Sequence, residues 1–143
     1  MPYTFTKFNQ FVEDLAKGVH NISTGAITLA LCDAAHAPVV TNTVLANLTQ
    51  ISYTNLSARV VTVTSCAQTS GTLKWVLTDL VLTASTGDVA PFKYVVVYND
   101  TPTSPADPLI GFYTYDADTT LRGANGDSIT VDFDAANGVF QMT

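Results

Sequence analysis

The first hydrophobic residues of the chain repeat with the spacing of a helix. Six apolar side chains follow one another at intervals of three or four residues, so that they share one helical face: Phe5, Phe8, Val12, Leu15, Val19 and Ile22. Thr4 or Thr6 can cap the start of such a helix, and Gly18 with Asn21 marks its end. The pattern predicts one amphipathic helix over residues 4–22. Its apolar face would pack either on the rest of the domain or on another subunit.

From residue 26 onward the hydrophobic period changes to two, the period of a strand. Ile27, Leu29 and Leu31 alternate with Thr28 and Ala30. Seven segments rich in valine, isoleucine, threonine and aromatic residues are predicted as strands: residues 26–32, 58–65, 72–84, 92–98, 109–115, 127–134 and 139–142.

The breaks between these segments carry residues that favour turns. Asn125-Gly126 is the sharpest of them and predicts a tight hairpin between residues 119–122 and the strand that begins at Ser128. We therefore expect a mainly β, antiparallel two-sheet sandwich or jelly-roll-like domain with one N-terminal amphipathic helix. No linker or repeat divides the chain. A single domain is expected over residues 1–143, with the helix at 4–22 and the β sandwich at 26–142.

Aromatic and loop residues refine this expectation. Phe92, Tyr94, Val96 and Tyr98 occupy alternate positions and are expected to face inward together. Residues 34–55 and 99–108 lack a clear period and are predicted as long loops, which often carry partner contacts. The N-terminal segment and residues 34–55 are the expected contact regions. The candidate contact residues are Phe5, Phe8, Val12, Leu15, Leu45 and Leu48.

Composition narrows the classes of partner. Hydrophobic residues make up 47% of the chain and charged residues only 13%, and the formal net charge is −6. The six basic residues are scattered, which argues against a nucleic-acid partner. No apolar run has the length of a membrane span or a signal sequence, so we expect synthesis in the cytoplasm and no membrane partner. Cys32 and Cys66 lack metal-ligand spacing and are interpreted as free thiols, with a disulfide left open.

The residues that could support chemistry are few. His20 and His36 are the only histidines, and neither lies in a recognisable catalytic motif, so we expect no enzymatic activity and no cofactor. Two pairs of alternating aspartates are weak candidates for a calcium site, namely Asp116, Asp118, Asp132 and Asp134. Because they alternate with apolar residues, the simpler interpretation places them on the solvated face of a strand.

Several longer stretches resemble those of a family of small proteins from tailed bacteriophages and prophages: FNQFVEDLA at 8–16, QTSGT at 68–72, YVVVYND at 94–100, DPLIG at 107–111 and VDFDAANGV at 131–139. The resemblance extends over nearly the whole chain. It implies a virion structural protein and is consistent with a capsid decoration or cement protein on the head exterior.

In that role the major capsid protein is the expected partner, and the chain is expected to form a homo-oligomer, with a trimer favoured. No catalytic residue is implied. An acidic domain suits the outside of a shell that holds DNA. Two alternatives stay open, a tail or neck component of the virion and a host-surface module that binds glycans through tyrosines and aspartates.

Overall fold

The computed structural model describes residues 3–143 and confirms a mainly β, antiparallel fold with one helix near the N-terminus. The elements are β1 (Phe5–Lys7), α1 (Asn9–Ala16), β2 (Ile27–Cys32), η1 (Leu45–Asn47), β3 (Val60–Val61), β4 (Val63–Thr69), β5 (Thr72–Leu77), β6 (Leu80–Thr83), β7 (Phe92–Asn99), β8 (Leu109–Thr119), η2 (Gly123–Asn125), β9 (Ser128–Val131) and β10 (Phe140–Met142).

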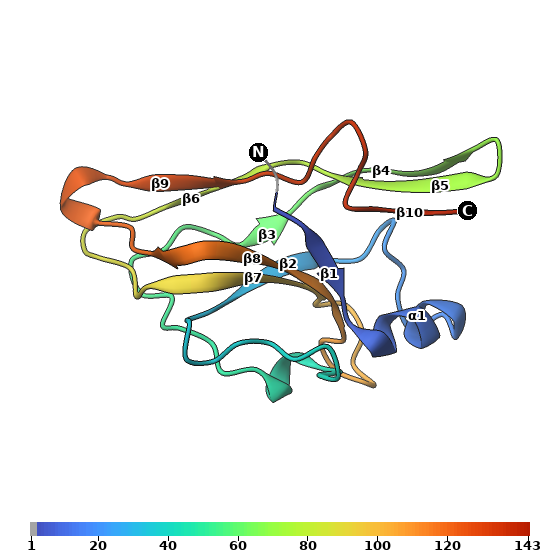
Figure 1. Cartoon of the computed structure of the whole chain (residues 1–143), viewed down its shortest axis with the longest axis horizontal. Coiled ribbons are helices and arrows are strands. Elements are labelled where there is room, and N and C mark those ends of the chain that lie inside the picture. The colour runs from blue at the N-terminus through green and yellow to red at the C-terminus, as the bar shows by residue number, and fades with distance from the viewer. Residues whose placement is uncertain (1–2) are drawn as a thin grey trace.

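The strands form two layers. The larger sheet has the order β1-β8-β7-β2-β3, and the other strands form a three-stranded sheet, β10-β5-β4, and a pair, β6-β9. Every strand pair is antiparallel. The two smaller sheets lie along one side of the larger sheet, which gives a sandwich-like arrangement (Figure 1). β1 and β10 are edge strands of their sheets.

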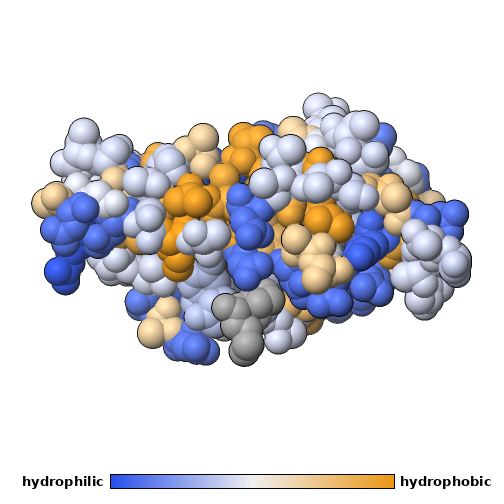
Figure 2. All heavy atoms as spheres, turned by 90° about the horizontal axis from the view of Figure 1, so that it is seen from above, coloured by the Kyte–Doolittle hydropathy of each residue, from blue (hydrophilic) through white to orange (hydrophobic). Residues whose placement is uncertain are grey.

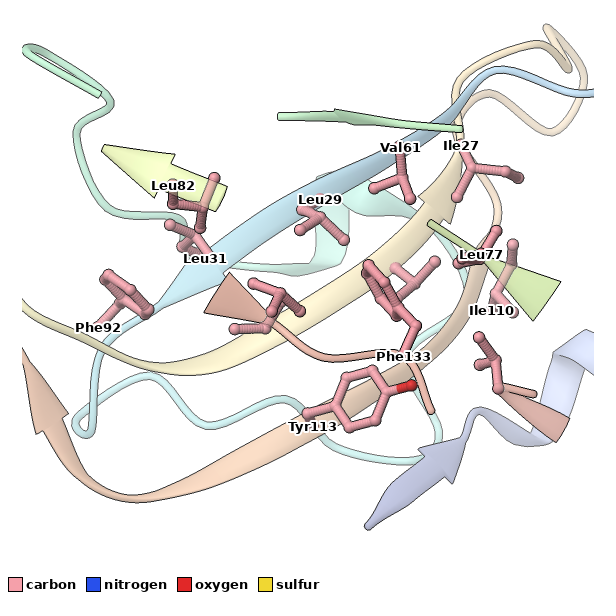
Figure 3. Packing of buried hydrophobic residues seen from close by; sticks show 14 of the residues in the cluster. Ile27, Leu29, Leu31, Val61, Leu77, Leu82, Phe92, Ile110, Tyr113 and Phe133 are labelled. Atoms are coloured by element: carbon pink, nitrogen blue, oxygen red, sulfur yellow. The ribbon is translucent and has the colours of Figure 1, made fainter. Parts of the chain in front are cut away.

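The main hydrophobic core lies between the layers. From β2 it receives Ile27, Leu29 and Leu31, all fully buried, and from the opposite layer it receives Leu77 and Leu82 (Figure 3). The alternation in the sequence predicted this face of β2. The same strand is buried on its other face too, because Ala30 and Cys32 are also fully inaccessible.

A second cluster covers the outer face of the larger sheet. Its buried members are Phe8, Ala30, Cys32, Val96, Tyr98, Leu109 and Phe112. Leu45 and Leu48 from the long loop at 34–55 pack against it. The loop is also tied down by backbone hydrogen bonds, since the amide of Leu45 donates to the Asp107 carbonyl and that of Leu109 to the Thr43 carbonyl (both 3.0 Å). The sheet therefore uses this loop as its own cover.

The predicted long helix is wrong in its bounds. Helix α1 spans only Asn9–Ala16, and Phe5 lies instead in β1, where it pairs with Tyr113 of β8. Within α1 the buried residues are Phe11 and Asp14, whereas Val12 is 52% exposed. The regular spacing over residues 4–22 arose from a strand, a helix and a loop in succession. Strand pairing with β8 overrode the local helical pattern.

Several predicted strands are interrupted or extended. The segment 72–84 is divided into β5 and β6, and β4 continues to Thr69, beyond the predicted segment at 58–65. The predicted inward row on β7 is largely buried, since Phe92 and Val96 are fully inaccessible and Tyr98 is 6% exposed. It does not face a single core, because a bulge shifts the pairing with β8 between Phe92 and Tyr94. Phe92 therefore packs in the main core, while Tyr94 and Tyr98 face the second cluster. A pattern of alternate residues cannot reveal such a bulge.

The predicted hairpin at Asn125-Gly126 does not form. Residues 123–125 are a turn of 3₁₀ helix, which Gly126 ends in the left-handed conformation at φ +63°. Strand β9 pairs with β6, not with the chain that precedes it. The carboxylate of Asp127 accepts the Arg122 amide (3.0 Å) and closes this loop locally. Asn125 and Gly126 therefore form the end of a 3₁₀ helix and not a hairpin turn.

Candidate functional site

The two histidines lie in different settings, one exposed and one buried. His36 is exposed in the long loop, where its Nδ1 lies 2.7 Å from Asp33 Oδ1. The hydrogen bond with His36, together with the electrostatic effect of the same ring, holds the pKa of Asp33 below its usual value. The same carboxylate oxygen accepts the amides of Ala35 and His36. The pair therefore organises a turn.

His20 is buried and lies after the end of α1. It is only 5% exposed, and its ring meets the ring of Phe11 edge-on at 5.2 Å. Neither ring nitrogen has a hydrogen-bond partner among residues 3–143, and the same holds for Asp14 Oδ2. Burial lowers the pKa of His20, while the charge of Asp14 acts in the opposite direction. His20 is thus a neutral packing residue near neutral pH.

This burial predicts a pH-dependent stability. Because the pKa of His20 is lower in the folded chain than in the unfolded chain, the unfolded chain takes up a proton first as the pH falls through about 6.5. We expect the free energy of unfolding, measured by urea denaturation, to decrease between about pH 7 and pH 5. His20→Phe should reduce this slope, and His36→Gln serves as the exposed control. Equal slopes in wild type and His20→Phe would exclude His20 as the source.

The four candidate calcium ligands do not gather into a metal site. Asp116 and Asp118 are exposed on β8, whereas Asp132 and Asp134 follow β9. Asp132 Oδ1 accepts the Asp134 amide (2.8 Å), and Asp134 accepts both the amide and the side-chain amide of Asn137. Nowhere in residues 3–143 do three metal-ligating side chains come together. The second aspartate pair instead stabilises the turn that leads to β10.

An apolar groove lies between β1, α1 and β10, and we call it the terminal groove. Its volume is about 390 Å³, and it is lined by Phe5, Lys7, Phe11, Val12, Leu15, Val139, Phe140, Gln141 and Met142. Phe140 packs against both Phe11 and Trp75, with ring centroids 5.4 Å apart in each case. Val12 is 52% exposed and Met142 is 45% exposed. The groove therefore presents apolar side chains to solvent between two edge strands.

The predicted partner residues are divided among three places. Phe5, Val12 and Leu15 line the terminal groove, as the proposal of an N-terminal contact region requires. Phe8 is fully buried beneath the long loop, so its assignment to a partner surface was wrong. Leu45 and Leu48 are partly buried against the same cluster, where they serve their own domain.

Sequence reasoning missed the other half of the groove. Phe11 fell outside the presumed helical stripe, and Phe140 and Met142 belonged to a short terminal strand with no visible link to the N-terminus. Pairing of β10 with β5 and of β1 with β8 brings these segments to one groove. Such non-local pairing has no signature in local periodicity. The alternation at 139–142 was the only available signal.

A second cavity, the tyrosine–aspartate cavity, lies beside β8 and β9. It also measures about 390 Å³ and is lined by Tyr3, Asp79, Tyr113, Tyr115, Ile129, Thr130, Val131 and Asp132. The rings of Tyr3 and Tyr115 stack with centroids 4.4 Å apart and an angle of 28° between their planes. Burial raises the pKa of Tyr115 to about 12, and the charges of Tyr3 and Asp132 act in the same direction. The cavity is polar, aromatic and acidic.

The remaining surface carries scattered apolar side chains. Figure 2, which views the molecule from the side of the two smaller sheets, shows apolar patches separated by hydrophilic residues. Val60 and Val81 are the most exposed valines of the strands, at 61% and 52%. Within residues 3–143, no helix is long and apolar enough to cross a membrane.

No protein-family model, no curated protein and no solved structure matches the chain. The function must therefore be argued from the surfaces of the molecule itself.

Proposed function

We propose that this chain is a bacteriophage virion structural protein, and specifically a capsid decoration protein that binds the major capsid protein on the outside of the head. The terminal groove is the observation that carries this proposal. It is an exposed depression lined mainly by apolar side chains, the kind of feature that marks protein–protein contact sites. The resemblance to small phage and prophage proteins supplies the class of partner.

The groove can supply binding energy in two ways. A partner side chain that enters it covers Val12, which is 52% exposed, and Met142, which is 45% exposed. Completing the burial of each contributes about half of the roughly 1.5–3 kcal/mol gained by a fully exposed side chain. β1 and β10 are also edge strands, which can accept hydrogen bonds from an added strand. The function needs these contacts alone, without a chemical step.

The charge of the chain suits an external position. The formal net charge is −6, and Lys7 is the only basic residue that lines the groove. An acidic domain is repelled by packaged DNA and is compatible with the outer surface of a shell. Repeated binding around the capsid lattice would then be strengthened if the chain acts as an oligomer, because later contacts become intramolecular. A trimer is the proposed state, and a mass measurement in solution tests it.

Separating heads from tails tests the location directly. Virions of the phage or prophage that encodes the chain would be dissociated, and heads and tails would be separated by sedimentation. The proposal predicts that the chain sediments with heads and is released without loss of the packaged DNA or the shell. Its recovery with tails would instead support the tail or neck alternative and contradict a decoration role.

A further inference from the structure

The tyrosine–aspartate cavity is separate from the terminal groove and holds two carboxylates in fixed positions. Asp79 Oδ1 accepts the amide of Phe133 (2.9 Å), and Asp132 Oδ1 accepts the amide of Asp134 (2.8 Å). The second oxygen of each carboxylate has no hydrogen-bond partner among residues 3–143. Each carboxylate is thus oriented by the backbone and keeps one oxygen available for a ligand.

Two tyrosines of the cavity lining provide a second observation, independent of these carboxylates. Tyr113 is 4% exposed and Tyr115 is 5% exposed, and both line the cavity. No group within residues 3–143 forms a hydrogen bond with either phenol oxygen. Figure 3 shows Tyr113 beside Phe133 on the core side of β8, and the two rings lie 6.0 Å apart. Neither phenol oxygen is a fully buried atom without a partner, so each hydroxyl opens toward the cavity, where a ligand can reach it.

The charges of the cavity select the class of ligand. Its lining contains two aspartates and no lysine, arginine or histidine. The ion pairs found in residues 3–143 join Glu13 to Lys17 and Asp33 to His36, so neither cavity carboxylate has a cation beside it. Burial and the nearby carboxylates of Asp132, Asp134 and Asp79 also raise the pKa of Tyr113, which indicates a negative local potential. The lining therefore disfavours an anion and favours a cation.

A guanidinium group matches this lining better than other cations. It is planar, carries several donors in a fixed fork, and stacks on aromatic rings, whereas an ammonium group is a strongly hydrated point charge. The free oxygens of Asp79 and Asp132 are acceptors for such donors, and the rings of Tyr3 and Tyr115 supply aromatic surface. Charge-assisted hydrogen bonds to carboxylates are among the stronger contacts in proteins.

We propose that the tyrosine–aspartate cavity binds an arginine side chain of a neighbouring virion subunit, with Asp79 and Asp132 as acceptors and the tyrosines as its aromatic wall. The virion source of the arginine rests on the proposed function, but the chemistry of the cavity does not. Arginine is a common anchor residue of protein interfaces. The cavity would then fix the orientation of the domain, while the terminal groove supplies apolar contact area.

The test uses the isolated full chain and a small probe, so that it does not depend on binding to heads. N-acetyl-arginine methylamide would be titrated while backbone amide resonances are followed by NMR, in parallel with the citrulline analogue, which is uncharged and nearly the same shape. We expect saturable shifts at Tyr115, Val131 and Asp132 with the arginine probe, and a dissociation constant on the order of millimolar. The citrulline probe should give no saturation.

Variants then assign the acceptors. Asp79→Asn and Asp132→Asn keep an oxygen that can accept the backbone amide but remove the charge, and each is expected to weaken arginine binding by about fivefold or more. Asp118→Asn removes the same charge from an exposed position outside the cavity and should leave binding within about twofold. Unchanged resonances away from the cavity will show that each variant is folded.

Three results would overturn the inference. Equal binding of the arginine and citrulline probes would show that the cavity does not recognise the positive charge. This result does not depend on the folding of any variant. Full arginine binding by the Asp79→Asn/Asp132→Asn double variant would place the probe elsewhere. Saturation by a methyl glycoside, with none by arginine, would assign the cavity to glycans. If the chain binds arginine but does not bind heads, arginine binding by the cavity is supported and the decoration role is rejected. Failure of the cavity proposal and failure of the decoration role are therefore distinguishable.

Discussion

Truncation of Trp75 to alanine is expected to lower the free energy of unfolding by about 3–5 kcal/mol. Trp75 is the largest fully buried side chain, and its ring packs on Phe140 of β10. Its indole nitrogen donates a buried hydrogen bond to the carbonyl of Ile22 (2.9 Å). One residue of β5 thus holds both the segment that follows α1 and the C-terminal strand. Chemical denaturation monitored by far-UV circular dichroism measures the loss.

A conservative variant separates the two contributions of Trp75. Trp75→Phe keeps much of the apolar volume but removes the donor, so the Ile22 carbonyl loses its partner, at a cost of about 1–3 kcal/mol. We expect it to fall between wild type and Trp75→Ala. If Trp75→Ala unfolds with nearly the wild-type free energy, the N-terminal segment and β10 are not held by this contact.

Charges placed in the terminal groove are expected to weaken binding to heads. Val12→Glu and Met142→Glu are exposed substitutions, so folding should be preserved, but each places a carboxylate where a partner would have to desolvate it. We expect each variant to weaken binding by about tenfold and the double variant by about 100-fold. Affinity would be measured by cosedimentation with heads that lack the chain.

Val81 offers the matched control, because it has the same 52% exposure as Val12 but lies on β6, away from the groove. Val81→Glu should bind heads as wild type does. If it weakens binding as strongly as Val12→Glu, general charge repulsion explains the loss and the groove has no special role. Deleting the N-terminal segment cannot replace this comparison, since Phe8, Phe11 and Ile22 are buried in the fold.

Local sequence patterns predicted the structural features that depend on residues close together in the chain. The mainly β class and the strands near 26–32, 92–98 and 109–115 follow from period-two alternation, and the alternation of β2 also identified its core face correctly. Errors arose where distant segments decide the structure. Pairing with β8 turned Phe5 into a strand residue, and the register shift after Phe92 divided the buried row of β7 between two clusters.

The residues that line the two cavities were also predicted only in part from local sequence patterns. Val12 and Leu15 were proposed as contact residues from the apolar stripe, and they do line the terminal groove. Its C-terminal wall could not be assigned, because β10 reaches β1 and α1 only through the three-stranded sheet. Asp132 was considered for calcium, yet its cavity partners Asp79 and Tyr3 lie far away in sequence. Only the folded arrangement joins them.

We propose that this domain acts by adhesion to the head through the terminal groove. An image reconstruction of the head that carries the chain tests it most directly. The proposal predicts density for the domain on the outer lattice, with β1, α1 and β10 against capsid subunits and the groove closed by them. Density on the tail, or a head-bound domain whose terminal groove opens to solvent, would contradict it.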